Sequence, residues 1–183
     1  MYKRQTQPLV EMIPNGDACT SVGYGGVLLT QGVLEYFQGE WSRKLFLTLP
    51  HIAVLEAWTT VMMAFTWGES FAGRKVVVRC NSKMACASLN RLNAKTADMG
   101  VICDLWEDIQ FHFGFEGLVV WCRGKSNRWA DVASRYEPDA VELGFDLCYE
   151  DTRRSKHPYL KIGVQWTRGD LSCAVEDLLM SLQ

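Results

Sequence analysis

The sequence predicts an α/β fold: a mixed five-stranded sheet, with three antiparallel strands followed by parallel strands, flanked by helices. Two observations support this fold. Three short strand-like stretches lie within residues 9–41, and such short connections permit only antiparallel pairing. From residue 52 onward, stretches with helical spacing alternate with short apolar runs, which is typical of strand–helix units. With 183 residues, 48% of them hydrophobic, the chain is long enough to bury one core.

The first three strands are expected close together, with a turn rich in glycine between the first two. An apolar stretch at 9–13 leads into a strand that ends at Asp17, and 19–25 forms the turn. The second strand is expected at 26–29 and the third at 32–41. Aspartate is a common turn former, so Asp17 by itself is more often a turn residue than a metal-binding carboxylate.

A long helix and a central strand are expected next. Apolar residues at three- and four-residue spacing predict a helix over 52–67, with Gly68 as its stop and Glu56 at the margin of the apolar stripe. The strand at 75–81 contains three consecutive valines, 76–78. This β-branched run predicts a strand buried on both faces, and therefore a central one.

The rest of the pattern completes the domain. A helix capped by Ser82, an amphipathic helix over 102–113, a strand at 118–122 and a helix capped by Asn127 follow in that order. We expect a tail at 1–8, one domain at 9–136 and an appendage at 137–183. The appendage has a strand-like stretch at 159–166 and a short amphipathic helix at 172–182.

Composition narrows the class of protein. A net charge of −2 gives no general attraction to polyanions, so nucleic acid would need a local patch or metal ions. The seven cysteines include no Cys-x-x-Cys pair, which argues against a zinc site and indicates free thiols inside a cell, in the cytoplasm or nucleus. No apolar run has the length of a membrane span, so no membrane partner is expected.

Four polar side chains occupy positions where a site can form. Asp17 and Asn81 end strands, whereas Glu56 and Asp131 lie in the first turns of helices. Strand ends and helix N-termini of such sheets commonly meet in one crevice, so these four are expected to converge. Each has a simpler reading by itself, because acids are favoured near helix N-termini and asparagine is favoured in turns.

Four blocks of sequence stand out together: DACTSVGYGGVL at 17–28, WS at 41–42 with HIAVLE at 51–56, residues 76–90, and GKSNRWADVASR at 124–135. They resemble the ribonuclease H (RNase H) domains attached to reverse transcriptases of DIRS-like and Ty3/gypsy-like retroelements. Each block alone is a weak signal, but the four occur in the family's order. The resemblance extends over residues 15–135 and leaves 137–183 unexplained.

The resemblance implies an RNase H-like fold that hydrolyses the RNA strand of RNA–DNA hybrids with two Mg²⁺ (or Mn²⁺) ions. Asp17 would bridge the ions, while Glu56 and Asp131 would each help to hold one. Asn81 stands where the family has another catalytic aspartate, and a neutral amide should weaken metal binding and impair the activity. The segment 121–123 also replaces a His-x-Pro sequence that family members often carry.

Polar side chains near the strand ends are candidates for binding the 2′-hydroxyls and phosphates of a hybrid. They are Thr20, Ser21, Ser82, Asn90, Arg123, Lys125 and Asn127. Further basic candidates for phosphate contact are Lys83, Arg91, Lys95, Arg128 and Arg135. The expected partners are an RNA–DNA hybrid and a reverse transcriptase domain in a larger polyprotein. Two alternatives stay open: a catalytically inactive domain that binds nucleic acid or supports a polymerase, and a protein-interaction scaffold.

Overall fold

The computed structural model describes residues 13–21, 23–30, 33–41, 51–135 and 160–166. The predicted tail at 1–8 and the predicted helix at 172–182 lie outside these residues. The described elements are β1 (Ile13–Ala18), β2 (Gly23–Thr30), β3 (Val33–Glu40), α2 (Ile52–Phe71), β4 (Lys75–Cys80), α3 (Lys83–Arg91), α4 (Ala97–Phe113), β5 (Glu116–Trp121), the 3₁₀ turn η1 (Gly124–Ser126), α5 (Arg128–Arg135) and β6 (Leu160–Trp166).

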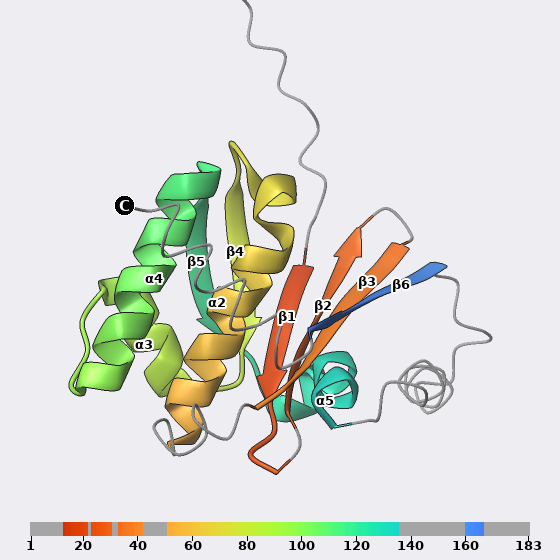
Figure 1. The fold of residues 1–183 in the computed structure, drawn as a ribbon, viewed down its shortest axis with the longest axis horizontal. Coiled ribbons are helices and arrows are strands. Elements are labelled where there is room, and N and C mark those ends of the chain that lie inside the picture. Colours follow the sequence, from red (N-terminus) through yellow and green to blue (C-terminus); the bar gives the residue numbers. More distant parts are fainter. Residues whose placement is uncertain (1–12, 22, 31–32, 42–50, 136–159, 167–183) are drawn as a thin grey trace, which may run out of the picture.

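The predicted mixed sheet is confirmed, and a further strand extends it (Figure 1). The strands lie in the order β5-β4-β1-β2-β3-β6. β1, β2 and β3 pair antiparallel, whereas β4 pairs parallel with β1 and β5 pairs parallel with β4. β6 pairs parallel with β3 and thus covers the edge strand of the five-stranded sheet. It coincides with the strand-like stretch expected at 159–166.

Helices cover the two faces of the sheet unequally. α2, α3 and α4 pack on one face around a large core, and α5 packs on the other face against β1, β2 and β3 (Figure 1). Side chains alternate between these faces along β2, because a strand has a period of two residues. Leu28 belongs to the large core, whereas Val27 belongs to the smaller cluster under α5. Among the described helices, none has the length and apolarity needed to cross a membrane.

The glycines of the first block lie in a strand, which corrects the predicted turn over 19–25. β2 begins at Gly23, and Gly25 pairs with Asp17 on one side and Gln38 on the other. A Cβ on Gly25 would lie 2.5 Å from the backbone carbon of Ala133 in α5. Glycine is therefore needed here for the close approach of a helix to the sheet, and not for a turn.

The long helix continues past its predicted end. α2 begins at Ile52, with His51 as its N-cap, but it runs through Gly68 to Phe71. A Cβ on Gly68 would lie 2.2 Å from the ring of Phe113, so this glycine lets α4 pack closely against α2. The chain reverses instead at Gly73, which has a φ of +70°.

The strand with three valines is interior in the sheet but is not buried on both faces, which corrects the prediction. Val76 and Val78 point into the large core, whereas Val77 is 47% exposed. α5 packs chiefly against β1, β2 and β3. The exposed face of β4 therefore follows from the position of one helix, which the strand sequence does not encode.

Candidate functional site

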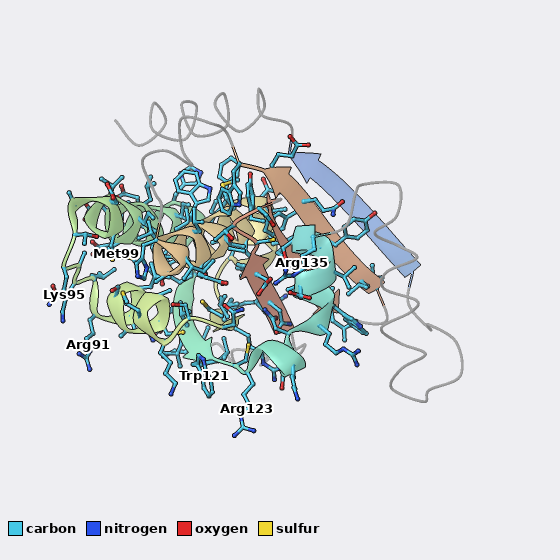
Figure 2. All side chains as sticks on the ribbon, turned by 90° about the horizontal axis from the view of Figure 1, so that it is seen from below. Arg91, Lys95, Met99, Trp121, Arg123 and Arg135 are labelled. Carbon is cyan, nitrogen blue, oxygen red and sulfur yellow. The ribbon has the colours of Figure 1, made fainter. Side chains whose placement is uncertain are left out.

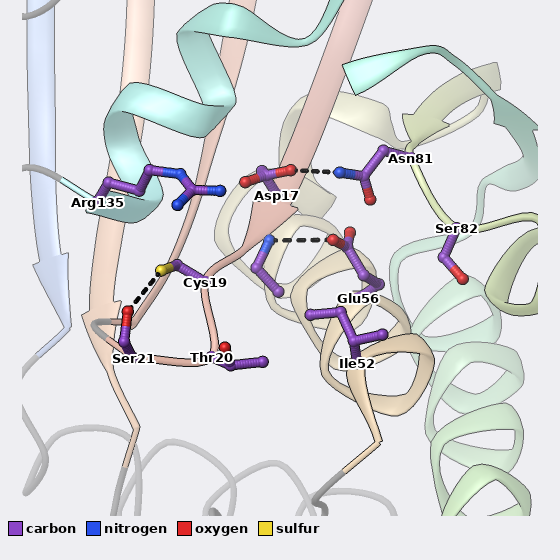
Figure 3. A pocket seen from close by; sticks show the side chains of 10 residues that line it. Asp17, Cys19, Thr20, Ser21, Ile52, Glu56, Asn81, Ser82 and Arg135 are labelled. Atoms are coloured by element: carbon purple, nitrogen blue, oxygen red, sulfur yellow. Dashed lines mark hydrogen bonds between the residues drawn. The ribbon is translucent and has the colours of Figure 1, made fainter. Parts of the chain in front are cut away.

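Three of the four predicted site residues line one cavity of about 510 Å³ at an edge of the sheet (Figure 3). Asp17 comes from β1, Glu56 from α2 and Asn81 from the residue after β4. The other lining residues are Ala18, Cys19, Thr20, Ser21, Ile52, Ser82 and Arg135. β1 and β4 are parallel neighbours, so their carboxyl ends lie at the same edge and bring Asp17 and Asn81 together.

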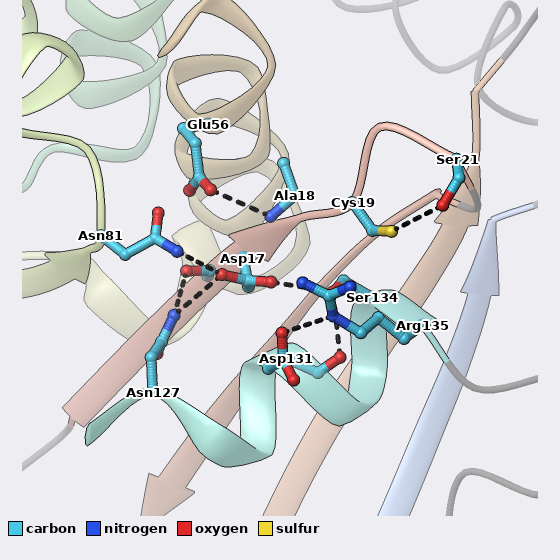
Figure 4. Close-up of polar contacts among 11 residues, drawn as sticks. Asp17, Ala18, Cys19, Ser21, Glu56, Asn81, Asn127, Asp131, Ser134 and Arg135 are labelled. Carbon is cyan, nitrogen blue, oxygen red and sulfur yellow. Dashed lines mark hydrogen bonds and ion pairs between the residues drawn. The ribbon is translucent and has the colours of Figure 1, made fainter. Parts of the chain in front are cut away.

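The Asp17 carboxylate is 2% exposed and is surrounded by hydrogen-bond donors (Figure 4). Its Oδ1 accepts from Nδ2 of Asn81 at 2.6 Å and from Nδ2 of Asn127 at 3.5 Å. Its Oδ2 accepts from the hydroxyl of Ser134 at 2.9 Å. Burial raises the pKa of Asp17 from 3.8 to about 6, and the hydrogen bond from Ser134 opposes this rise.

The Glu56 carboxyl group is also buried, at 3% exposure, although the sequence placed it at the margin of the apolar stripe. The backbone N–H of Ala18 donates to its Oε1 at 3.4 Å, and the thiol of Cys80 lies 3.9 Å from its Oε2. Burial raises the pKa of Glu56 from 4.5 to about 8, and the nearby charge of Asp17 adds to this rise. A buried acid in a polar cavity is a recognised mark of a functional site.

Asp131 is the predicted site residue that does not line the cavity. It lies on α5, where Nε of Arg135 donates to its Oδ1 at 2.5 Å in a half-exposed ion pair one turn apart. Arg135 itself reaches the cavity near Asp17 (Figure 3). The helix N-terminus therefore places a third carboxylate beside the site and pairs it with a cation of the same helix.

The donors at the cavity suit a hard cation. Magnesium prefers oxygen ligands and is commonly bound through one or two carboxylates together with substrate phosphates and water. Asp17 and Glu56 supply two carboxylates, and the Asn81 amide can supply a neutral oxygen. In the part of the chain that the structure describes, no three His, Cys, Asp or Glu side chains cluster closely enough for a metal site. Asp17 and Glu56 are the two carboxyl groups that line the cavity, whereas the carboxylate of Asp131 is paired with Arg135.

The predicted substrate-binding residues divide into two groups. Thr20, Ser21 and Ser82 line the cavity, and Ser82 also caps α3 by accepting from the N–H of Ala85. Arg123 and Lys125 lie exposed in the turn after β5. For all five residues, contact with substrate stays a prediction.

Asn90 and Asn127 use their amide groups within the fold. Asn90 of α3 donates to the carbonyl of Val119 at 2.7 Å and accepts from its N–H at 2.8 Å, so it pairs with β5 as a neighbouring strand would. Asn127 is 2% exposed and donates to the carbonyl of Gly16 at 2.8 Å, which ties the start of α5 to β1. Neither residue lines the cavity.

Two residues of the site were not singled out in the sequence. Ser134 bonds Asp17, and the indole Nε1–H of Trp121 donates to the backbone carbonyl of Asn81 at 3.1 Å. The position of Ser134 carries a signal, since it lies three residues after Asp131 in the same block and so one turn along the helix. Trp121 lies in the segment 121–123, which departs from the family pattern, but the sequence does not show its contact with Asn81, because the two residues are 40 positions apart.

Comparisons with known proteins give the fold. No protein-family model and no curated protein matches the chain. RNase H1 from the halophilic archaeon Halobacterium salinarum is similar in structure, with a TM-score of 0.51 at 11% identity; the match covers 67% of this chain and 92% of that one. LC11-RNase H1, solved in complex with an RNA/DNA hybrid, has a TM-score of 0.51 at 14% identity over 67% of this chain and 93% of its own. The five strands β3-β2-β1-β4-β5 with their flanking helices therefore form an RNase H fold.

Proposed function

We propose that this chain is an RNase H-like nuclease domain of a reverse-transcribing element that acts on RNA–DNA hybrids. The observation that carries the proposal is the convergence of Asp17, Glu56 and Asn81 on one cavity of an RNase H fold. A structural neighbour is bound to an RNA/DNA hybrid, which supports the same class of substrate here. The retroelement origin is supported by the four sequence blocks between residues 17 and 135.

Catalysis would need a divalent cation, Mg²⁺ or Mn²⁺, with two ions in a fully equipped site. Asp17 and Glu56 would hold the first ion, and Asp131 would help to hold a second. Such ions stabilise the charge that develops on the attacking and leaving oxygens of a phosphodiester. Asn81 offers no anionic ligand and instead donates its amide N–H to Asp17, so we propose that hydrolysis is impaired in this chain.

The alternative is a catalytically inactive RNase H-like domain that binds nucleic acid or has a structural role. Two contacts favour it. Asn81 donates a hydrogen bond to one oxygen of Asp17, and Arg135 donates one to an oxygen of Asp131. Both carboxylates therefore already have partners within the protein. Arg135 also brings a positive charge to the cavity that would face a phosphate.

We further propose that the domain works beside a reverse transcriptase domain in a larger polyprotein, inside a cell in the cytoplasm or nucleus. The support is the type of RNase H domain that the four blocks resemble. Scattered cysteines agree with a reducing compartment, and the five that the structure describes as free include the buried Cys80 and Cys86.

The test is cleavage and binding of a labelled RNA–DNA hybrid, with Mg²⁺ or Mn²⁺, by the wild type and Asn81→Asp. Asn93→Asp is the matched control, because it makes the same chemical change at an exposed position away from the cavity. Cleavage by Asn81→Asp alone is the expected result and identifies a nuclease disabled at one ligand. Cleavage by the wild type as well would show that Asn81 is tolerated.

Binding without cleavage by either protein would favour the inactive domain. The absence of both cleavage and binding at low salt would overturn the proposed action on hybrids.

A further inference from the structure

Trp121 is an exposed tryptophan beside the cavity. It is the last residue of β5 and is 44% exposed, whereas Trp58, Trp67 and Trp106 are buried. In the sheet it pairs with Cys80, the residue before Asn81. Exposing a large aromatic ring forgoes the hydrophobic stabilisation that burial would provide. The exposed position of the Trp121 ring is therefore not explained by stabilisation of the core.

The indole ring is held in place from two sides. Its Nε1–H donates to the carbonyl of Asn81 at 3.1 Å, and the ammonium of Lys83 lies 4.6 Å from the ring centroid in a cation–π contact. Asn81 and Ser82, the two residues between β4 and Lys83, both line the cavity. A ring fixed in this way loses little conformational freedom when a ligand stacks on it. We name Trp121 and Lys83 together the rim platform.

The rim platform lies on the side of the molecule where basic residues project. In Figure 2 the side chains of Trp121 and Arg123 point outward from neighbouring positions at the end of β5. Arg123 follows two residues later and is not paired in any described ion pair. An aromatic ring beside lysine and arginine side chains is the combination that binds single-stranded nucleic acid, where rings stack on bases and cations contact phosphates.

We propose that the rim platform binds an unpaired nucleotide next to the hybrid, with the base stacked on Trp121 and Lys83 near its phosphate. This inference rests on the nucleic-acid function proposed above. Bases inside a duplex are stacked on both faces, whereas an unpaired base offers a full face to an exposed ring. Every base has such a face, so the preference concerns an unpaired strand and not a particular sequence. The preferred ligand is thus a hybrid with a single-stranded overhang.

The test measures the Kd of the full chain, by fluorescence anisotropy in a metal-free buffer, for a blunt hybrid and for the same hybrid with a short overhang. We expect the wild type to bind the overhang hybrid more tightly and Trp121→Ala to bind it about 5- to 150-fold more weakly than wild type. The blunt hybrid should be bound about equally by both. Phe111→Ala is the control, because it removes an aromatic ring that is 89% exposed on α4, before β5 begins.

Trp121→Phe separates stacking from an effect through Asn81. It keeps an aromatic ring but removes the indole N–H, so it should retain most of the preference for the overhang. Loss of the preference in this variant, with native thermal unfolding, would contradict stacking and assign Trp121 a positioning role toward Asn81. Equal affinity of the wild type for both hybrids would overturn the inference and leave the proposed function standing. Failure to bind either hybrid in this metal-free buffer would also overturn the inference, whereas the proposed function is decided by the cleavage and binding test with Mg²⁺ or Mn²⁺.

Discussion

Replacing Glu56 with glutamine tests whether α2 buries a protonated acid at the cavity. Glutamine has nearly the same shape and still offers an oxygen to the N–H of Ala18. Burial raises the pKa of Glu56 from 4.5 to about 8, and the pKa of Asp17 from 3.8 to about 6. Between pH 6 and 8, therefore, Glu56 keeps its proton in the folded protein but has released it in the unfolded chain. Of these two acids, Glu56 is the one that dominates the pH dependence in this range.

The sign and size of the effect follow from proton linkage. A raised folded-state pKa stabilises the fold at low pH, and this contribution is lost as the pH rises through the folded value. Each pH unit in this window corresponds to about 1.4 kcal/mol, so the wild type should lose about 2–3 kcal/mol between pH 6 and 8 relative to Glu56→Gln. The two proteins should differ least below pH 4.5, where the acid is protonated in both states.

The assay is urea unfolding at a series of pH values from 4 to 9, with a chelator present so that no metal binds the carboxyl group. Glu107→Gln, at an exposed position on α4, is the control for removing one glutamate, and it should leave the pH profile unchanged. Parallel profiles for the wild type and Glu56→Gln from pH 6 to 8 would refute the reasoning. They would mean that water or a structural change relieves the burial of Glu56.

Two further variants test how the site is held. Asn90→Ala removes both hydrogen bonds to the backbone of Val119 and should lower the free energy of unfolding by about 1–3 kcal/mol; an unchanged urea midpoint would show that water replaces the amide without loss. Gly25→Ala forces a Cβ to within 2.5 Å of the Ala133 backbone and should destabilise the fold by about 1–3 kcal/mol or more. Gly124→Ala, where no atom lies within 4 Å of the added Cβ, should change the melting temperature little, and equal effects at the two glycines would contradict the packing argument.

The order and type of the elements could be predicted because these depend on residues close in sequence. The short strand-like stretches before residue 41 and the three- to four-residue spacing after Ile52 are local patterns, and the structure has strands and a helix there. The joint placement of Asp17, Glu56 and Asn81 was also predictable, since strand ends of a parallel pair meet at one edge. The predictions of substrate, metal and activity are still to be tested by experiment.

Element ends and exposed faces depended on distant neighbours and were therefore predicted wrongly. Gly25 and Gly68 look like a turn residue and a helix stop, because their contacts with Ala133 and Phe113 are invisible in the local sequence. Val77 looks buried, because a run of valines does not reveal that α5 packs chiefly against β1, β2 and β3.

The same division applies to the candidate site. The sequence by itself determined which chemical groups stand at the strand ends and helix starts: three carboxyl groups and one amide, all four of which were expected to converge. The structure brings Asp17, Glu56 and Asn81 to the cavity and leaves Asp131 outside its lining. Only the tertiary structure decided what each group contacts. It bonds the Asn81 amide to Asp17, pairs Asp131 with Arg135 and sets Trp121 against Asn81. Hydrogen bonds and ion pairs form between side chains that the fold brings within about 3 Å, and that distance is a property of packing rather than of residue order.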